Sequence, residues 1–279
     1  MTRRSSRAFL RRHAWRNDRH HRQRTPWEHP RGRPRTGWIP GAHLLGKGRR
    51  DSLRVGDAGL LFLTVPDGAI AELAAKLGAR PGQAVVHCSG ALGLEVLGPL
   101  ASAGVPTGCF HPLQTFPSST PDPDRFQGIA VGIEGPGHLR EKLEDIAREL
   151  GSRPFRLEGV DRALYHAAAV TASNFVVALA TAAGRLWSLA GLPPEEGREA
   201  LAPLMLSAAQ NVSRMELAEA LTGPVARGDV ETVARHLASL EAAPALRELY
   251  RRLSLELLQL PLPLDPGRRS ALAARLVES

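Results

Sequence analysis

The sequence has few cysteines, and this shortage excludes several kinds of site. Its 279 residues include only Cys88 and Cys109, too few for a disulfide framework and compatible with a reducing cytoplasm. No group of cysteines and histidines has the spacing of a metal site, so we expect no metal. Neither cysteine has a base and an orienting group at a readable spacing, so we do not expect thiol catalysis.

Long apolar runs are also scarce. No apolar run near the N-terminus is long enough for a secretory signal. The longest stretch without charge or histidine, Ala167–Gly184, has 18 residues and is close to the lower limit for a membrane span. It is rich in alanine and contains four polar side chains, Thr171, Ser173, Asn174 and Thr181. This composition predicts a buried helix of a soluble protein, and we expect no membrane partner.

Acidic residues are nearly absent from the first fifty positions. Residues 1–50 hold 15 Lys/Arg and 2 Asp/Glu, and the rest of the chain holds 21 and 26, so the net charge of +8 comes from this segment. The segment has neither a regular periodicity nor the apolar content of a core. It fits a basic arm for nucleic acid or anionic membranes, a transit peptide, a disordered extension, or an out-of-frame translation of GC-rich DNA. We favour the last.

Strand and helix patterns alternate over residues 51–158. This alternation predicts a doubly wound, mostly parallel Rossmann-like sheet of the α/β class. Its first βαβ unit is atypical or missing, because the nearest glycine-rich match, at Gly46-Lys47-Gly48, lacks a third glycine and a preceding strand. We expect strands at 59–65, 84–87, 107–110, 128–133 and 154–157, and helices at 69–77, 92–103 and 139–150.

Residues 159–279 predict an all-α domain. Its first helix, over residues 162–190, is apolar on every side at its centre, so it should be buried inside the domain or between subunits. We therefore expect a homodimer formed through this domain. A turn-rich loop at 221–229 is expected to end in Asp229, which caps the helix after it. Further helices are expected at 194–211, 229–240, 243–260 and 266–276.

Several motifs of this chain, in the same order, resemble those of bacterial Rossmann-like proteins with a C-terminal DUF2520 domain. They are Val65-Pro66-Asp67, His87-Cys88-Ser89-Gly90-Ala91, His111-Pro112-Leu113-Gln114-Thr115-Phe116, Phe126-Gln127-Gly128, Tyr165-His166-Ala167-Ala168-Ala169, Ala172-Ser173-Asn174 and the loop from Ala220 to Asp229.

These proteins are distant relatives of 6-phosphogluconate dehydrogenase and pyrroline-5-carboxylate reductase. The resemblance implies an oxidoreductase that uses NADP, or NAD, to reduce a small carbonyl or imine, and some members are similar to a ketopantoate reductase. Members usually begin with a glycine-rich βαβ unit, and Met1–Arg50 stands in its place here. This departure is our reason to favour a frame error, and it bears on cofactor binding by this chain.

The expected cofactor residues follow the first two strands of the sheet. They are Val65, Pro66, His87, Ser89 and Gly90. His87 and Ser89 precede a helix pattern, where backbone N–H groups favour a cofactor phosphate or a substrate carboxylate. A helix cap with a buried histidine explains the same residues equally well.

Two polar loops are expected to bind substrate. His111, Gln114 and Thr115 follow the adjacent strand, and their uncharged donors and acceptors suit a carbonyl or amide. A turn formed around Pro112 is the alternative. In the loop at 221–229, Thr222 could contact the substrate and Arg227 could clamp its carboxylate or phosphate bidentately. There the alternative is a plain turn before a capped helix.

The expected catalytic residues are His166, Asn174 and Arg227. In the related dehydrogenases that the resemblance brings in, a lysine four residues before an asparagine protonates the substrate, but Val170 stands there in this chain. The three lysines all lie outside the helical domain, and an unperturbed histidine pKa of about 6.5 suits His166 as the acid. Polar contacts within a buried helix are the alternative for His166 and Asn174. Tyr165 is expected to pack rather than react.

Two other functions compete with a reductase. The missing glycine-rich turn favours a non-catalytic ligand-binding or regulatory protein on the same scaffold, since fold does not determine function. A basic arm that tethers nucleic acid is the third interpretation, although we do not expect a nucleic-acid partner.

Overall fold

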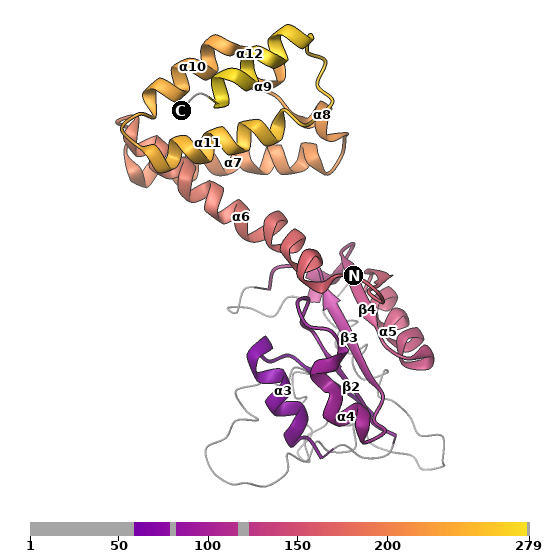
Figure 1. Cartoon of the computed structure of the whole chain (residues 1–279). Helices are drawn as coiled ribbons and strands as arrows, with labels where there is room; N and C mark the ends of the chain where they lie inside the picture. Colours follow the sequence, from indigo (N-terminus) through magenta and orange to yellow (C-terminus); the bar gives the residue numbers. More distant parts are fainter. Residues whose placement is uncertain (1–58, 79–81, 117–122, 278–279) are drawn as a thin grey trace. The chain divides into compact units, whose positions relative to one another are not determined.

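The computed structural model describes residues 59–78, 82–116 and 123–277 (Figure 1). The proposals for Met1–Arg50 therefore lie outside the described residues. The chain divides into two compact units, Met1–Ser173 and Asn174–Ser279. This division falls inside one long helix, whereas the sequence placed the domain boundary after residue 158.

The first unit contains a sheet of five strands in the order β1-β2-β3-β4-β5. The strands are β1 (Leu60–Leu63), β2 (Ala84–His87), β3 (Thr107–Pro112), β4 (Ala130–Glu134) and β5 (Arg153–Arg156). All neighbouring pairs are parallel except β3 and β4, which are antiparallel. The predicted Rossmann-like, mostly parallel α/β fold is confirmed.

Helices cover both faces of this sheet (Figure 1). On one face lie α3 (Asp67–Lys76), the 3₁₀ turn η1 (Leu94–Leu97) and α4 (Gly98–Ser102), and on the other lies α5 (Gly137–Glu149). Alternate residues of a strand point to opposite faces, so Val85 packs toward α3 and α4 while Ala84 and Val86 pack toward α5. A second 3₁₀ turn, η2 (Pro123–Phe126), precedes β4.

The single helix expected over 92–103 is wrong. Its place is taken by η1 and α4, after a stretch in which Gly93 has an extended backbone at φ −87 and ψ −172. Pro99 lies in the first turn of α4, where a residue without a backbone N–H can begin a helix but cannot continue one. The loop after β2 is therefore longer than the sequence pattern indicated.

The long helix α6 (Arg162–Leu189) has the expected bounds but a different environment. None of its 28 residues is buried, and the side chain of Val177 is 68% exposed. The expectation that its own domain buries this helix is wrong. It is the one helix in the described part of the chain with the length and composition of a membrane span.

The second unit is helical, as expected, and its core lies between α9, α10, α11 and α12. Asp229 caps α10 by accepting a hydrogen bond from the Thr232 backbone N–H at 3.0 Å, as the sequence predicted. The expected turn-rich loop at 221–229 contains one short helix, α9, and a second short helix, α8, comes just before it. The elements are α7 (Pro194–Val212), α8 (Leu217–Ala220), α9 (Pro224–Arg227), α10 (Val230–Ser239), α11 (Pro244–Leu257) and α12 (Pro266–Val277).

Candidate functional site

The polar cluster of the first unit lies where β1 and β2 end. Ser89 donates a hydrogen bond from Oγ to Asp67 Oδ2 at 2.8 Å, which links the loop after β2 to the start of α3. The same Oγ accepts hydrogen bonds from the backbone N–H groups of Ala91 and Leu92, each at 3.2 Å. Ser89 therefore holds the loop in one conformation and orients the Asp67 carboxylate.

His87 is buried completely at the end of β2. Its Nδ1 accepts a hydrogen bond from the Ser89 backbone N–H at 3.2 Å, which leaves the ring proton on Nε2. No hydrogen bond of standard geometry reaches that buried Nε2 from the described residues, although the Gly93 backbone interacts with the ring and opposes the fall in its pKa. Burial, aided by the positive charge of Arg162, lowers the pKa of His87 to about 4, so the ring is neutral at pH 7.

His111 and Tyr165 form the second part of the cluster. His111 Nδ1 lies 2.6 Å from the Tyr165 hydroxyl, and the His111 tautomer sets which of the two groups donates. Burial raises the pKa of Tyr165 to about 12 and lowers that of His111 to about 4, so both groups are neutral at pH 7. The hydrogen bond thus joins the end of β3 to the first turn of α6.

Two glycines make room for this pair. A Cβ on Gly90 would lie 2.6 Å from His111 Cε1, and a Cβ on Gly132 would lie 3.1 Å from the Tyr165 hydroxyl oxygen. Gly132 faces His111 in the antiparallel register of β3 and β4. The side chains of His111 and Tyr165 therefore lie directly against the backbone of the loop after β2 and of the middle of β4.

His166 lies beside this pair on α6. The ring centroids of His111 and His166 are 6.4 Å apart, and His166 Nδ1 is buried without a hydrogen-bond partner among the described residues. A buried ring nitrogen that lacks a partner is rare in native proteins, and an ordered water, a ligand or a role in proton transfer accounts for such an atom. The structure thus places the predicted acid next to the predicted substrate-binding residue His111.

A charged pair anchors the first turn of α6. The Arg162 guanidinium forms a salt bridge with Glu134 at the end of β4, and the two side chains are only 11% and 21% exposed. Arg162 also donates to Cys109 Sγ at 3.7 Å. Because Tyr165 and His166 follow Arg162 within one turn, this pair determines where their side chains lie.

The remaining predicted residues of the first unit are less closely joined. Val65 packs on the core beside α3, and Pro66 is exposed next to Asp67. Gln114 and Thr115 are exposed and bond mainly to each other, since Gln114 Oε1 accepts from the Thr115 backbone N–H at 2.8 Å. Their geometry is that of the local turn that the sequence left as the alternative.

Three predicted residues belong to the second unit. Asn174 is exposed on α6, Thr222 is exposed before α9, and Arg227 is exposed at the last position of α9. Gly228, which follows Arg227, has a left-handed backbone at φ 67 and ends α9. The roles of Asn174, Thr222 and Arg227 in substrate binding stay predictions.

Both thiols lie in surroundings that disfavour the thiolate. Burial raises the pKa of Cys88 to about 12 and that of Cys109 to about 11, so neither forms the thiolate that nucleophilic chemistry needs at pH 7. Within the described residues, no group of histidine, cysteine and carboxylate side chains could hold a metal ion.

Sequence families and solved structures were then compared with the chain. The model of a Rossmann-like domain matches residues 50–112, and that of DUF2520, a domain of unknown function, matches residues 129–257. The crystal structure of protein TM1727 from Thermotoga maritima is 30% identical, the match covers 72% of this chain and 76% of that protein, and the TM-score is 0.60. The chain belongs to the family of Rossmann-like proteins with a DUF2520 domain.

Two further similarities involve oxidoreductases. A candidate NADP oxidoreductase, BF3122 from Bacteroides fragilis, is 28% identical over 76% of this chain and 80% of its own, with a TM-score of 0.61. Pyrroline-5-carboxylate reductase from Streptococcus pyogenes is 14% identical over 73% of this chain and 77% of its own, with a TM-score of 0.48, a similarity too low to bear on function. No curated protein sequence matches the chain.

The candidate site of this family member lies at one edge of the sheet. The loops after β1, β2 and β3 end side by side, and the buried His87 Nε2 and His166 Nδ1 lack partners there. Parallel α/β sheets bind ligands at this edge. The glycine-rich turn that holds a pyrophosphate does not occur in the described ranges 59–78, 82–116 and 123–277.

Asp67, Arg162 and Tyr165 were not among the predicted site residues. Asp67 follows Pro66 at the end of β1, and its position opposite the next strand end was the available signal. Tyr165 was expected to pack, and it does so against Phe155, with ring centroids 6.0 Å apart, in addition to its hydrogen bond with His111. The partners of Arg162 are 28 and 53 residues away in sequence, so no local pattern could reveal them.

Proposed function

We propose that the chain is an oxidoreductase that uses NADP, or NAD, to reduce a small carbonyl or imine. The observation that carries this proposal is the cluster at the ends of β2 and β3, where His166 Nδ1 is buried without a partner beside the neutral His111–Tyr165 pair. The similarity to the candidate NADP oxidoreductase of Bacteroides fragilis supports the choice of reaction.

The loops after β1 and β2 would hold the nicotinamide end of the cofactor. Val65, Pro66 and Gly90 would offer backbone, and Ser89 would keep the loop after β2 in place through its bond to Asp67. When bound, the cofactor supplies the hydride. His87, which is neutral and has an unpaired Nε2–H, would donate a hydrogen bond to a ligand in this loop.

His166 would supply the proton. In a reduction the hydride adds to the carbon of the C=O or C=N bond, and the heteroatom takes a proton from the imidazolium of His166, which becomes neutral. His111 and Tyr165 position this ring, since Tyr165 adjoins it on α6 and His111 lies 6.4 Å from it between centroids. The Arg162–Glu134 pair keeps this turn of α6 on the sheet.

The test is NADPH oxidation with a panel of small 2-oxo acids and cyclic imines. We expect His166→Gln to lower kcat by about a hundredfold, the usual contribution of a positioned acid, and to leave NADPH affinity unchanged. The matched control is His138→Gln, because the His138 side chain is 81% exposed on α5 and outside the cluster. Equal kcat for His166→Gln and the wild type would remove His166 from the mechanism.

A ligand-binding protein without catalysis is the second candidate. The absence of a glycine-rich turn from the described residues favours this candidate, because that turn normally binds the pyrophosphate of the nicotinamide cofactor. Saturable binding of a small 2-oxo acid or imine, with no NADPH oxidation by any member of the panel, would favour this candidate over the reductase.

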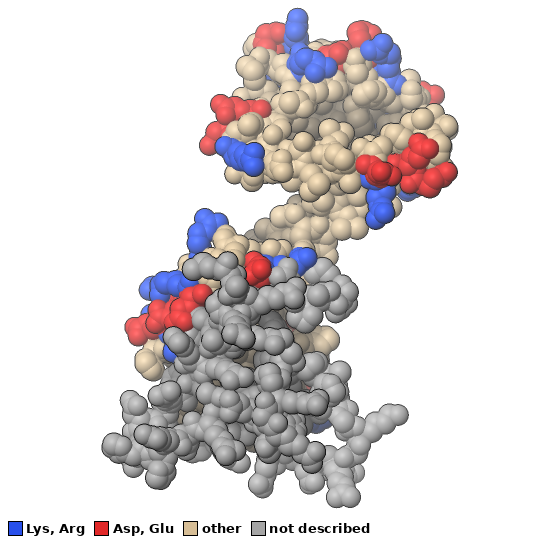
Figure 2. Space-filling view, turned by 180° about the vertical axis from the view of Figure 1, so that it is seen from behind, with Lys and Arg blue, Asp and Glu red and all other residues tan. Residues whose placement is uncertain are grey.

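We also propose that two copies of the chain pair through α6 in the cytoplasm. The exposed apolar side chains of its central turns, including Phe175 at 53% and Val177 at 68%, form a surface that a soluble protein normally covers. Thr171, Ser173 and Thr181 donate to backbone carbonyl oxygens four residues earlier, so their hydroxyls need no water. Figure 2 shows a broad uncharged surface on the helical unit, with charged side chains at its rims.

Analytical ultracentrifugation of the full chain tests this pairing. Val177→Glu is expected to convert a dimer into a monomer, because a buried unpaired carboxylate is strongly unfavourable at an apolar interface. Val277→Glu is the matched control, since Val277 is 63% exposed on α12. A wild-type chain that sediments as a monomer would overturn the proposal.

A further inference from the structure

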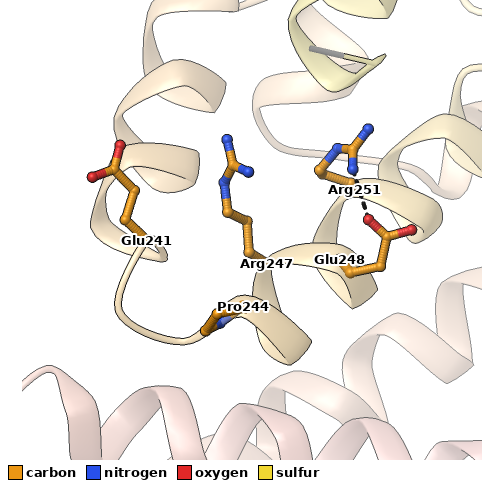
Figure 3. Close-up of a pocket in the computed structure, with 5 residues that line it drawn as sticks. All are labelled: Glu241, Pro244, Arg247, Glu248 and Arg251. Carbon is orange, nitrogen blue, oxygen red and sulfur yellow. Dashed lines mark hydrogen bonds and ion pairs between the residues drawn. The ribbon is translucent and has the colours of Figure 1, made fainter. Parts of the chain in front are cut away.

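A small cavity opens in the helical unit at the junction of α10 and α11 (Figure 3). Its volume is about 190 Å³, and it is lined by Glu241, Pro244, Arg247, Glu248 and Arg251. Pockets for drug-sized ligands usually measure about 300–1,000 Å³. The cavity therefore suits a ligand of a few heavy atoms.

Arg247 is the side chain that makes this cavity a candidate site. It rises between Glu241 and Arg251, and its Nε is buried without a hydrogen-bond partner among the described residues (Figure 3). Leaving a buried donor of a charged group unsatisfied is unfavourable, and more so than for a neutral group. A ligand that accepts from this N–H would recover that energy.

The other charged groups of the cavity are already paired. Arg251 donates to Glu248 at 2.7 Å and to the Val277 carbonyl oxygen at 2.9 Å, which fixes its guanidinium as a wall of the cavity. Glu248 also accepts from Arg252 at 2.6 Å, and these bonds lower its pKa, so it stays charged and occupied. Arg247 is therefore the cation of this cavity that is not neutralised by a described side chain.

We propose that Arg247 binds a small oxyanion in this cavity. A carboxylate or phosphate can accept two parallel N–H bonds from the Nε edge of a guanidinium, which is the edge left unpaired here. Arg251 adds a second positive charge beside the ligand, whereas Glu241, on the other side, limits the affinity. The site lies within the helical unit and is separate from the cluster around His166.

The experiment is a titration of the full chain with inorganic phosphate and, separately, with acetate, followed by thermal unfolding at constant ionic strength. Binding to the folded state raises the unfolding temperature in proportion to the logarithm of ligand concentration above Kd. We expect a saturable rise with at least one of the two anions, and the better anion distinguishes a tetrahedral from a planar ligand. Chloride at equal ionic strength corrects for screening.

Three variants decide the assignment. Arg247→Lys keeps the positive charge but loses the two parallel N–H donors of the guanidinium, and it should weaken binding by about tenfold or more. Glu241→Gln should tighten binding, because it removes a negative charge beside the anion. Arg235→Gln is the matched control, since Arg235 is an exposed arginine of α10 outside the cavity and should bind as the wild type does.

Two outcomes would overturn the proposal. One is a wild-type chain whose unfolding temperature responds to phosphate and acetate no more than to chloride. The other is an equal response in Arg247→Lys and the wild type, which would place the anion elsewhere. Circular dichroism of each variant before the titration excludes loss of fold as the cause of lost binding.

Discussion

Replacing Gly90 by alanine tests the central contact of the candidate site. The new Cβ would lie 2.6 Å from His111 Cε1 and 2.7 Å from His111 Nε2, distances that real Cβ contacts do not reach. Because Gly90 is not among the glycines with a positive φ, alanine meets no backbone strain, and the collision with the ring is the whole effect. His111 must turn away, which breaks its hydrogen bond to Tyr165.

The expected loss of stability follows from three contributions. Overpacking a buried site costs about 1–3 kcal/mol, and loss of the hydrogen bond costs about 1 kcal/mol. The lower entropy of the unfolded chain returns about 0.4–1 kcal/mol. We therefore expect Gly90→Ala to lower the free energy of unfolding by about 2 kcal/mol in urea titrations.

A control and a double variant sharpen this test. Gly137→Ala should stabilise the chain slightly, because Gly137 begins α5 and a Cβ there meets no atom within 4 Å. Tyr165→Phe should cost about 1 kcal/mol in the wild type and almost nothing in Gly90→Ala, since the hydrogen bond is already lost there. An equal cost of Tyr165→Phe in both backgrounds would refute the reasoning.

Three other predictions concern stability. The pKa of His87 falls from 6.5 to about 4 on folding, so its contribution is complete above pH 6.5 and is lost as the pH falls toward 4, by about 3 kcal/mol. His87→Gln should reduce the loss of unfolding free energy between pH 7 and 5, and an unchanged loss would assign it to other groups. Arg162→Gln should lower the free energy of unfolding by about 3 kcal/mol, since it leaves the Glu134 carboxylate partly buried and unpaired. A loss below about 0.5 kcal/mol in urea titrations would contradict this. Asp229→Ala should lower the unfolding temperature through loss of the α10 cap, and Glu231→Ala, two residues later in the first turn, should lower it less. Equal shifts in unfolding temperature for the two variants would count against the cap.

The sheet could be predicted because each strand carries a local signal. Val85 and Val86 belong to a short β-branched run that ends at polar residues, and such a run indicates a buried strand whatever it pairs with. The antiparallel pairing of β3 and β4 has no local signal of this kind, because pairing direction depends on contacts between distant residues. The extended backbone of Gly93, which shortens the helix after β2, likewise has no local signal in the sequence.

The candidate site was only partly predictable. His87, His111 and His166 were found because strand ends and helix faces can be placed from periodicity alone. The contact between Tyr165 and His111 depends on how α6 lies over the sheet, which the Arg162–Glu134 pair determines across 28 residues of sequence. The exposure of α6 could not be predicted either, because an apolar helix has the same pattern whether its own domain or a second copy covers it.

Binding of NADPH, followed by its nicotinamide fluorescence, tests the proposed function most directly. The full chain is titrated beside Ser89→Ala, which removes the hydroxyl that joins the loop after β2 to Asp67. We predict a saturable fluorescence change with the wild-type chain and a weaker affinity for Ser89→Ala. No change up to about 1 mM NADPH, the upper end of the usual KM range, would contradict a role as a nicotinamide-dependent reductase.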